Sequence, residues 1–466
     1  MKPNIFREYD IRGIVGSEFI IDQSYQLGQA IGTFWQQKHP ESTRAIVGMD
    51  GRTHSAPIKE LIVQGLVDMG FDVIDVGVCP TPAVYFAVNQ LHIPTAMIIT
   101  ASHNPKEYNG IKPWGCWGAQ IQAIRKLYEE TTSPKMAARK GSINYYNIID
   151  EYVDYLAQHF KHLHNAPIKA IIDCGNGSAG TVMPALLKKM GWDQVQLLFA
   201  QVDGTFPNHE ADPTVPENMT HVAQALAQDP TLEIGLGLDG DCDRMNPMTR
   251  GGYLVPGDKM LALFAKKVLT QHPGAAVVCD IKSSAGLLDA LTSWGGKACI
   301  APSGHAYIKK AMAEHEGILG GELSCHFFFR DRYFGYDDGI YAILRTIELL
   351  QESRQSLDQL LTQVPHKVSS PEFRIPCKDD TQKFLIVNHL VQILSARPHK
   401  EIITIDGIRA HMDYGWGLIR ASNTQPVLCL RFESDTDEGL RQIKQDFLTP
   451  LITYFNEQYL RDVIGL

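Results

Sequence analysis

The chain has 466 residues, and 43 lysines and arginines against 52 aspartates and glutamates give it a net charge of −9. This balance excludes proteins that hold nucleic acid or anionic membranes by an overall positive charge. Hydrophobic residues make up 44% and charged residues 20%, as in ordinary globular proteins. At about 150 residues per domain, the length predicts about three domains.

The N-terminus carries charged side chains within its first ten residues and lacks the apolar core of a signal peptide. The apolar stretch that starts at Leu61 is interrupted by three aspartates, so we expect no membrane span. The nine cysteines are scattered without a C-x-x-C pair, which favours reduced thiols. We therefore expect a cytoplasmic, monomeric protein that binds neither nucleic acid nor membranes.

Three short apolar runs end in an aspartate and a turn, as strands of a parallel sheet often do: residues 45–50, 170–173 and 276–280. Each is followed by a helix-like segment: residues 56–69, 181–190 and 285–294. This recurring strand-turn-helix pattern predicts three related α/β domains.

The pattern changes after about residue 367. Separate strand candidates are followed by one helix candidate, at residues 401–405, 416–420, 427–433 and 437–454. We interpret this part as a smaller α+β domain. The predicted domains are therefore residues 1–150, 151–255, 256–367 and 368–466.

The loop "TASHNP" follows a strand-like run at residues 96–99 and contains Ser102. Serine, asparagine and proline are ordinary turn residues, so a simple turn remains one interpretation. The chain has no G-x-S-x-G motif, which disfavours serine hydrolase chemistry.

The segment 175–180 matches G-x-G-x-x-G between a predicted strand and a predicted helix, as in dinucleotide-binding proteins. That fingerprint also needs an acidic residue at the end of the next strand. Here the apolar run at 195–200 is followed by Gln201, and Asp203 comes only in the following loop. We favour a tight structural turn, and a dinucleotide-dependent oxidoreductase remains an alternative.

The motif "DGDCDR" places Asp239, Asp241 and Asp243 directly after a strand-like run at residues 234–238. Because the three alternate, their carboxylates can converge on one point. Three such charges repel one another unless a divalent cation lies between them, and oxygen ligands favour Mg²⁺, Mn²⁺ or Ca²⁺. Counting from Asp239, arginine stands where an EF-hand needs its glycine and its glutamate, which argues against calcium sensing.

An acidic surface turn is the alternative for this motif. Arg244, directly after the aspartates, is better explained by a phosphate nearby. A serine hydroxyl combined with a three-aspartate metal site indicates phosphoryl transfer, because a metal and basic groups neutralise the oxygens of the moving group.

Two later loops carry polar side chains. In "GELSCH", Glu322 and Ser324 alternate onto one side and could bind vicinal hydroxyls, although a polar loop before a buried strand explains them equally well. In "RASNTQP", a guanidinium, hydroxyls and amides stand together, as a phosphate cradle requires. The alternative there is a hairpin turn whose polar side chains bind no phosphate.

In this order, "TASHNP", "DGDCDR", "GELSCH" and "RASNTQP" resemble the signature loops of the α-D-phosphohexomutase family, and specifically those of its bacterial phosphomannomutase/phosphoglucomutase branch. "FREYDIRG" near the N-terminus and "FFFRDRYFGYDDGIY" continue the resemblance, which spans the whole chain. It implies three related α/β domains with mixed sheets, plus a smaller C-terminal α+β domain, around a central cleft.

The resemblance implies that Ser102 carries a phosphoryl group and that Mg²⁺ is bound by Ser102, Asp239, Asp241 and Asp243. The phosphoserine would convert a hexose 1-phosphate to a hexose 1,6-bisphosphate, which is both intermediate and activator. After this bisphosphate turns over, its other phosphoryl group would return to Ser102 and release the 6-phosphate.

By the same resemblance, Lys112 is the candidate for proton transfer, with His103 and His305 as alternatives. A lysine base needs a lowered pKa. Arg244 is expected to contact the phosphoserine. The remaining candidates would bind substrate: Tyr9, Arg12, Lys282, Glu322, Ser324, His326, Arg420, Ser422, Asn423 and Thr424.

Glu322 and Ser324 would bind the sugar hydroxyls O3 and O4. If O2 is not bound, glucose and mannose are both accepted, because they differ only at C2. Phosphoglucosamine mutases of this family carry glutamine at the position of Leu323, so we favour neutral hexoses and keep a phosphoglucosamine mutase as the alternative. A non-catalytic sugar-phosphate-binding protein is a third interpretation.

Cys242 and Cys325 stand where relatives often have glycine. Each loop must therefore accommodate a side chain, and we expect exposed thiols there. This suggests that oxidation slows the enzyme.

Overall fold

The computed structural model describes residues 1–130, 137–423 and 425–466. The described chain divides into two compact units. The first unit comprises Met1–Pro256, Ser324–Phe329 and Tyr336–Gln359, and the second comprises Gly257–Leu323, Arg330–Gly335 and Leu360–Leu466. The predicted boundaries at 150, 255 and 367 remain predictions.

The first unit contains a six-stranded sheet with the strand order β1-β5-β4-β2-β3-β6. The central strands β4, β2 and β3 are parallel, whereas β5 pairs antiparallel with both β1 and β4. The strands are β1 (Ile11–Ile14), β2 (Arg44–Met49), β3 (Asp72–Val78), β4 (Ala96–Ile99), β5 (Tyr108–Pro113) and β6 (Ile143–Tyr145).

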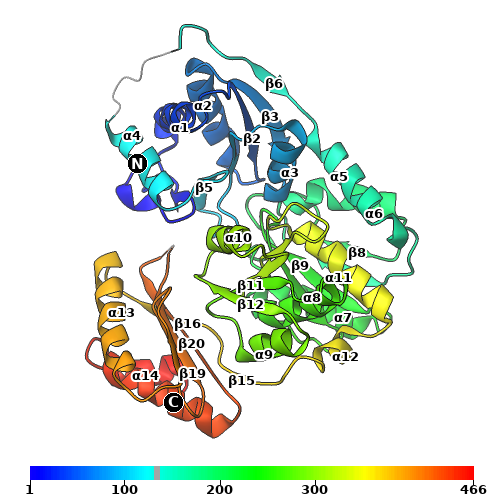
Figure 1. Cartoon of the computed structure of the whole chain (residues 1–466). Helices are drawn as coiled ribbons and strands as arrows, with labels where there is room; N and C mark the ends of the chain where they lie inside the picture. The colour runs from blue at the N-terminus through cyan, green and yellow to red at the C-terminus, as the bar shows by residue number, and fades with distance from the viewer. Residues whose placement is uncertain (131–136, 424) are drawn as a thin grey trace. The chain divides into compact units, whose positions relative to one another are not determined.

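Helices α1 (Ser24–Lys38) and α2 (Ser55–Asp68) pack side by side in this part of the unit (Figure 1). Glycines permit their close approach, because a Cβ atom on Gly28 would lie 2.4 Å from the Ile62 carbonyl oxygen. The other helices here are α3 (Thr81–Leu91) and α4 (Ala119–Glu130).

The second sheet of this unit has the order β10-β9-β7-β8, with β7, β8 and β9 parallel and β10 antiparallel. Its strands are β7 (Ala170–Asp173), β8 (Gln196–Leu198), β9 (Ile234–Leu238) and β10 (Met245–Thr249). The remaining elements of the unit are α5 (Ile148–His159), α6 (Met183–Met190), α7 (Thr220–Gln228), β14 (Phe327–Phe329) and α11 (Gly339–Ser353).

Helix α11 begins against the loop that joins β9 to β10. The Asp338 carboxylate caps the helix by accepting from the Tyr341 N–H at 2.8 Å and from the Tyr152 hydroxyl at 2.7 Å. The Gly339 N–H donates to the Cys242 carbonyl at 2.9 Å. The start of α11 therefore supports the aspartate-rich loop.

In the second unit, β11 lies between β12 and β13, and all three are parallel. These elements are α8 (Gly257–Gln271), β11 (Ala276–Asp280), α9 (Ala285–Ser293), β12 (Lys297–Ala301), α10 (His305–Glu314) and β13 (Leu319–Gly321). The short helix α12 (Leu357–Leu361) follows α11 in the chain.

The C-terminal part of the second unit is an antiparallel sheet with helices. Its elements are β15 (Val368–Ser369), β16 (Phe373–Pro376), α13 (Asp380–Ser395), β17 (Glu401–Ile403), β18 (Ile408–His411), β19 (Trp416–Ala421), β20 (Val427–Ser434), α14 (Asp437–Leu451) and α15 (Glu457–Ile464). Short 3₁₀ turns elsewhere in the chain cover Pro3–Ile5, Ile21–Gln23, Lys161–Leu163, Ser178–Thr181 and Pro216–Met219.

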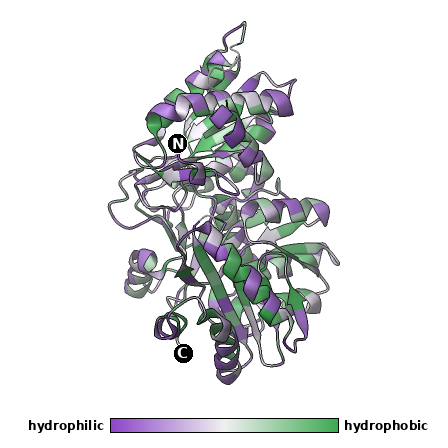
Figure 2. Ribbon diagram, turned by 90° about the vertical axis from the view of Figure 1, so that its left-hand side faces the viewer, coloured by the Kyte–Doolittle hydropathy of each residue, from purple (hydrophilic) through white to green (hydrophobic). Residues whose placement is uncertain are grey.

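Hydrophobic residues are concentrated on the strands, whereas many helices carry both hydrophobic and hydrophilic residues (Figure 2). This is the pattern expected when helices cover sheets and leave one face to water. The predicted fold class, three α/β domains with mixed sheets and a smaller α+β part, is confirmed.

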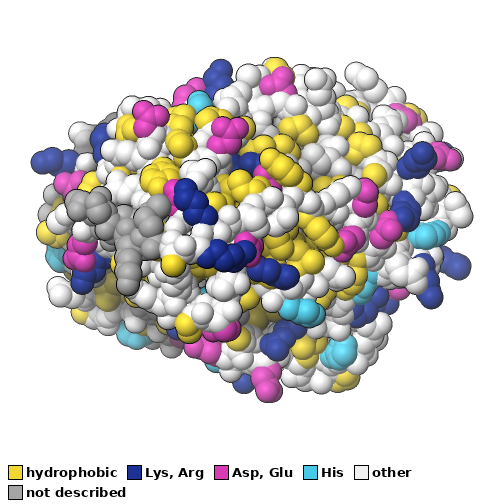
Figure 3. Space-filling view, turned by 90° about the horizontal axis from the view of Figure 1, so that it is seen from above, with side chains coloured by type: hydrophobic (Ala, Val, Ile, Leu, Met, Phe, Trp, Pro, Cys, Tyr) yellow, Lys and Arg dark blue, Asp and Glu magenta, His cyan; other side chains and the backbone are white. Residues whose placement is uncertain are grey.

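Basic and acidic side chains are interspersed on the face seen from above (Figure 3). Among the described residues, no helix is both long and apolar enough to span a bilayer.

Candidate active site

The site residues of the first unit lie on loops that leave the carboxyl ends of parallel strands, one in each of its two sheets. The Ser102 loop follows β4, and the Asp239 loop follows β9. Parallel α/β sheets commonly place their functional loops at this edge. The fold therefore explains why residues far apart in the sequence meet here.

Ser102 is 3% exposed and has a left-handed backbone with φ +49°. Its Oγ donates to Asp239 Oδ2 at 2.7 Å and lies 3.1 Å from His103 Nδ1. Its N–H donates to Thr100 Oγ1 at 2.9 Å. The hydroxyl is thus held against the aspartate-rich loop by specific contacts.

Asp239, Asp241 and Asp243 are all fully buried, and one carboxylate oxygen of each lies within 4.8 Å of the others. The Oδ1 atoms of Asp241 and Asp243 are buried without a hydrogen-bond partner. Buried carboxylate oxygens without donors are costly unless a cation is bound. Oxygen ligands in this arrangement fit a hard divalent cation.

Burial and the nearby Asp243 raise the pKa of Asp239 to about 7. Burial also opposes ionisation of Asp243, but Lys112 and His326 together outweigh it and lower the pKa of that carboxyl. The neighbouring side chains therefore do not fully stabilise the negative charge of these carboxylates. This is a second reason to expect a cation here.

Lys112 lies on β5 and donates to Asp241 Oδ2 at 2.7 Å and to Asp243 Oδ2 at 2.6 Å. Burial opposes its charge, but these two carboxylates outweigh burial and hold its pKa well above the ordinary value. The lowered pKa that we expected for a lysine base is therefore not found. In this arrangement Lys112 is a proton-bearing cation.

Arg244 Nε lies 3.1 Å from Asp239 Oδ2, the same oxygen that accepts from Ser102. Its NH2 group is buried without a hydrogen-bond partner. Burial and the charge of Arg244 hold the pKa of His103 well below its ordinary value, so this imidazole is neutral. The surroundings of Ser102 thus contain an unused guanidinium donor and a neutral histidine.

His326 and Arg12 approach this site from other segments of the first unit. His326 Nδ1 lies 3.6 Å from Asp243 and 3.2 Å from Asp337. Arg12 NH1 donates to Asn104 Oδ1 at 2.6 Å and so contacts the Ser102 loop directly. Tyr9 is 8% exposed and Ser324 is half-buried, and their roles remain predictions.

Several residues at this site were not predicted from the sequence. Thr81 Oγ1 donates to Asp241 Oδ2 at 2.6 Å, and Asp212 lies 3.3 Å from Arg244 NH1. Arg52 donates to four carbonyl groups in or next to the Ser102 loop. The predicted strand at residues 45–50 was the only sequence signal that could have placed Arg52 here. Arg52 follows that strand closely, and loops at the ends of neighbouring parallel strands meet.

The G-x-G-x-x-G segment supports the aspartate loop. A Cβ atom on Gly177 would lie 2.7 Å from the Gly240 carbonyl oxygen, and the Ser178 N–H donates to that oxygen at 2.9 Å. A Cβ atom on Gly180 would lie 1.8 Å from the Ala200 carbonyl oxygen. The glycines thus permit close packing of the chain on itself, which supports the structural interpretation over dinucleotide binding.

In the second unit, predicted residues again follow the ends of parallel strands. Lys282, after β11, lies 3.6 Å from Asp280 and 3.1 Å from Glu372. Burial opposes its charge, but these acids raise its pKa. Glu322, after β13, is 3% exposed, and its Oε1 accepts from the Gly304 N–H at 2.8 Å.

The "RASNTQP" loop is fixed by neighbours within the same unit. Arg420 Nε donates to Asp406 Oδ2 at 2.7 Å, and Asn423 Nδ2 donates to the Ser303 carbonyl at 3.2 Å. The Ser422 carbonyl accepts from Lys383 Nζ at 2.6 Å. His305 begins α10, two residues after Ser303. Thr424 lies outside the described residues.

The expectation of exposed thiols is wrong. Cys242 and Cys325 have φ values of +63° and +68°, as positions that suit glycine do, but they are 0% and 1% exposed. The Cys325 thiol donates to Asn246 Oδ1 at 3.2 Å. Burial raises the pKa of Cys242 well above its ordinary value. Both thiols are packing groups, so the predicted sensitivity to oxidation has no structural basis here.

We expect Ellman's reagent to modify the native protein first at Cys377, because the other cysteines are buried. Turnover should be unchanged at that stage, and all nine thiols should react in denaturant. Rapid native-state labelling of Cys242 or Cys325, measured by peptide mass spectrometry, would contradict this assignment.

Gly240 lies against the Ser102 loop, since a Cβ atom there would lie 2.5 Å from the Ser102 carbonyl oxygen. Gly240→Ala should lower kcat about 100-fold by displacing Ser102. It should also lower the free energy of unfolding by about 1–3 kcal/mol. Gly251→Ala is the control, because its nearest contact would be an ordinary 3.6 Å. Equal kinetics for both variants would exclude this role of Gly240.

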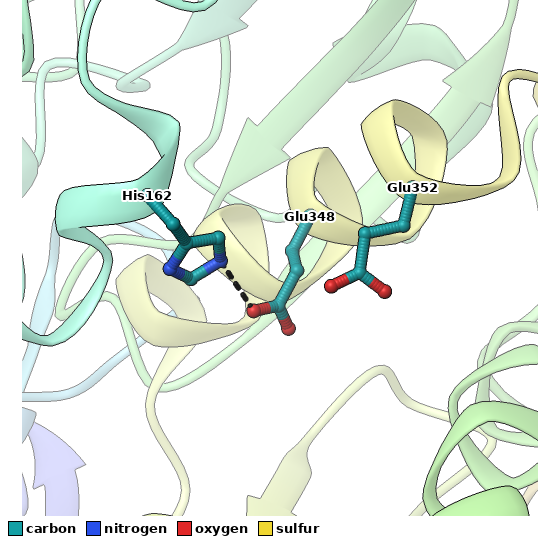
Figure 4. Close-up of side chains that lie close together, drawn as sticks. All are labelled: His162, Glu348 and Glu352. Carbon is teal, nitrogen blue, oxygen red and sulfur yellow. Dashed lines mark hydrogen bonds and ion pairs between the residues drawn. The ribbon is translucent and has the colours of Figure 1, made fainter.

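A separate group of side chains, His162, Glu348 and Glu352, converges from a 3₁₀ turn and α11 (Figure 4). His162 Nε2 lies 2.8 Å from Glu348 Oε1, and Arg345 Nε lies 3.3 Å from Glu348 Oε2. Because both oxygens of this buried carboxylate already face cationic or polar groups, we interpret the group as an ion-pair cluster.

Comparison with known proteins agrees with this geometry. Four domain families described as phosphoglucomutase/phosphomannomutase match in order: α/β/α domain I at residues 3–136, domain II at 150–252, domain III at 256–368 and the C-terminal domain at 372–449. The chain belongs to the phosphoglucomutase/phosphomannomutase family. The family resemblance predicted from the sequence is confirmed, and the chain is a hexose phosphate mutase.

Relatives in this family match over almost their whole length. The phosphomannomutase/phosphoglucomutase of Pseudomonas aeruginosa is 39% identical, over 97% of this chain and 96% of that protein. The phosphoglucomutase of Neisseria meningitidis is 38% identical, over 95% and 96%. A solved phosphoglucomutase/phosphomannomutase family structure from Burkholderia thailandensis has a TM-score of 0.87 at 34% identity, over 97% and 98%.

Proposed function

We propose that this mutase interconverts the 1- and 6-phosphates of glucose and mannose through phosphorylated Ser102 and a hexose 1,6-bisphosphate. The observation that carries the proposal is the contact between Ser102 and the aspartate loop. A buried hydroxyl lies 2.7 Å from a carboxylate of a three-aspartate cluster that has unused oxygens. Phosphoryl transfer needs this combination of nucleophile and cation site.

We infer that Ser102, Asp239, Asp241 and Asp243 hold Mg²⁺, because all four supply oxygen ligands and the cluster has unpaired acceptor atoms. When bound, the ion would neutralise charge on the oxygens of the transferring phosphoryl group. Lys112 and Thr81 orient Asp241 through their hydrogen bonds to its Oδ2. Arg244, through its unused NH2 group, would donate to the phosphoserine.

Proton transfer in this proposal involves the groups nearest Ser102. His103 is neutral and lies 3.1 Å from Oγ, so it can take a proton from this oxygen or return one. In the first transfer, the proton that leaves the sugar hydroxyl would pass to Ser102 Oγ through His103. In the return transfer, Lys112, which holds a proton in this arrangement, would donate to the sugar oxygen and regain a proton from Ser102 through His103. His305 remains an alternative.

In the second unit, Arg420, Ser422 and Asn423 would bind the phosphate that is not being transferred, because they combine a guanidinium, a hydroxyl and an amide. Glu322 would accept hydrogen bonds from the sugar hydroxyls, together with Ser324. Binding at O3 and O4 is compatible with either sugar orientation. It leaves C2, where glucose and mannose differ, without a discriminating contact.

The test is turnover of glucose 1-phosphate, mannose 1-phosphate and glucosamine 1-phosphate with Mg²⁺ and glucose 1,6-bisphosphate, followed by phosphorus NMR. We expect 6-phosphate products from glucose and mannose at comparable kcat/KM, and far slower turnover of the amino sugar. Preferred turnover of glucosamine 1-phosphate would instead favour a phosphoglucosamine mutase. Absence of turnover with all three would refute the proposal.

A further inference from the structure

Arg52 lies beneath the Ser102 loop with a side chain that is 1% exposed. Its NH2 group donates to the carbonyl oxygens of Ser102 at 2.7 Å and Asn104 at 2.6 Å. Its NH1 group donates to the carbonyl oxygens of Pro105 at 2.8 Å and Tyr108 at 3.2 Å. One guanidinium thus binds three backbone carbonyls of the Ser102 loop and that of the first residue of β5.

The guanidinium is itself held in place. Its Nε lies 3.2 Å from Asp50 Oδ2. The other oxygen of Asp50 accepts from the Arg52 N–H at 3.0 Å and from Ser55 Oγ at 2.6 Å. The ring of Phe206, from a distant segment of the first unit, lies 5.0 Å from the guanidinium carbon. A buried carboxylate and an aromatic ring therefore fix the orientation of Arg52.

This arrangement explains how Ser102 keeps an unfavourable backbone conformation. A non-glycine residue at φ +49° is costly and persists only where its surroundings determine it. The Ser102 carbonyl accepts from Arg52, and Gly240 packs closely against the same oxygen. Both contacts act on the nucleophile's own backbone, so they set where its Oγ lies relative to Asp239.

We propose that Arg52, oriented by Asp50 and Phe206, is a positioning residue that holds Ser102 in line for phosphoryl transfer. Arg52 does not contact Oγ; it acts through the backbone carbonyls. Lysine cannot replace it, because a single ammonium lacks the planar set of five N–H donors that reaches four carbonyls at once. This inference rests on the proposed role of Ser102.

Arg52→Lys tests the proposal, with Arg345→Lys as the matched control. Arg345 is likewise buried, with a side chain that is 3% exposed, and it lies 3.3 Å from a buried glutamate and 4.4 Å from the ring of Phe329. Both variants therefore replace a buried guanidinium, paired with a carboxylate and packed on an aromatic ring, by an ammonium group. Only Arg52→Lys should alter the Ser102 loop.

Two readouts distinguish positioning from general stability. Hydrogen exchange should speed up in Arg52→Lys at the amides of Thr100, Asn104 and Tyr108, which bond within or next to the loop, and should be unchanged there in Arg345→Lys. For fully phosphorylated protein, kcat should fall about 100-fold in Arg52→Lys while KM stays within a few-fold. Phe206→Leu should give a smaller change of the same kind.

Unchanged exchange in the loop, or equal losses of kcat in the two lysine variants, would overturn the positioning role. A wild-type protein without mutase turnover would refute the proposed function instead. In that case the hydrogen-exchange comparison still decides whether Arg52 organises the loop.

Discussion

Ser102→Ala is expected to abolish phosphorylation of the protein and to lower mutase turnover by at least about four orders of magnitude. In the proposed mechanism this hydroxyl receives and gives the phosphoryl group, and in the structure it contacts Asp239 at 2.7 Å. The neighbouring His103 is neutral and cannot replace this oxygen at the same position. Intact mass and turnover with Mg²⁺ and glucose 1,6-bisphosphate measure the two effects.

Ser24→Ala is a suitable control for this variant. Ser24 is fully buried in the same unit, and its Oγ has no hydrogen-bond partner. Its removal should leave phosphorylation and turnover unchanged, and it should be neutral or slightly stabilising. If Ser102→Ala kept its phosphoryl mass and its turnover, the serine would be only a turn residue.

Asp241→Asn should raise the Mg²⁺ concentration needed for half-maximal turnover by at least about 100-fold. The substitution keeps the shape of the side chain but removes charge from a carboxylate whose Oδ1 has no other partner. Wild-type protein should gain thermal stability as Mg²⁺ is added, because the ion binds only the folded state. The variant should lose that gain, and without metal it should be less stable than the wild type, because Lys112 keeps only Asp243 as a carboxylate partner.

Asp154→Asn controls for loss of a negative charge, since Asp154 is 61% exposed and pairs with Lys189 on the surface. It should keep the wild-type Mg²⁺ dependence in both assays. Removal of Mg²⁺ by EDTA should stop wild-type turnover, and addition of Mg²⁺ should restore it. A variant Asp241→Asn with wild-type Mg²⁺ dependence would show that the aspartate cluster is not the metal site.

Short buried strands were predicted well because their apolar runs end sharply. The strands at 170–173, 234–238 and 276–280 have those bounds in the structure. The C-terminal helix expected at 437–454 ends at Leu451, and a further helix, Glu457–Ile464, was not anticipated. Its apolar residues Leu460 and Ile464 pack into the core. Two buried apolar residues four positions apart are too few to indicate a helix from the sequence.

The site was predicted only where motifs carry unusual side chains. Ser102 and Asp239 are 137 residues apart, and their own motifs identified both. Arg52 follows β2 and Thr81 begins α3, in segments of ordinary composition, so their contacts depend on tertiary structure. Cys242 shows a further limit, because its glycine-like backbone agrees with expectation, whereas its burial is set by surrounding elements such as the start of α11.

The most direct test of the mechanism follows a labelled phosphoryl group through the first turnover of each protein molecule. Protein carrying radiolabelled phosphate on Ser102 is mixed with excess unlabelled glucose 1-phosphate and Mg²⁺, and the label is located over time. We predict that the label leaves the protein, appears in glucose 1,6-bisphosphate and then in glucose 6-phosphate. Formation of glucose 6-phosphate while the label stays on the protein would contradict the account.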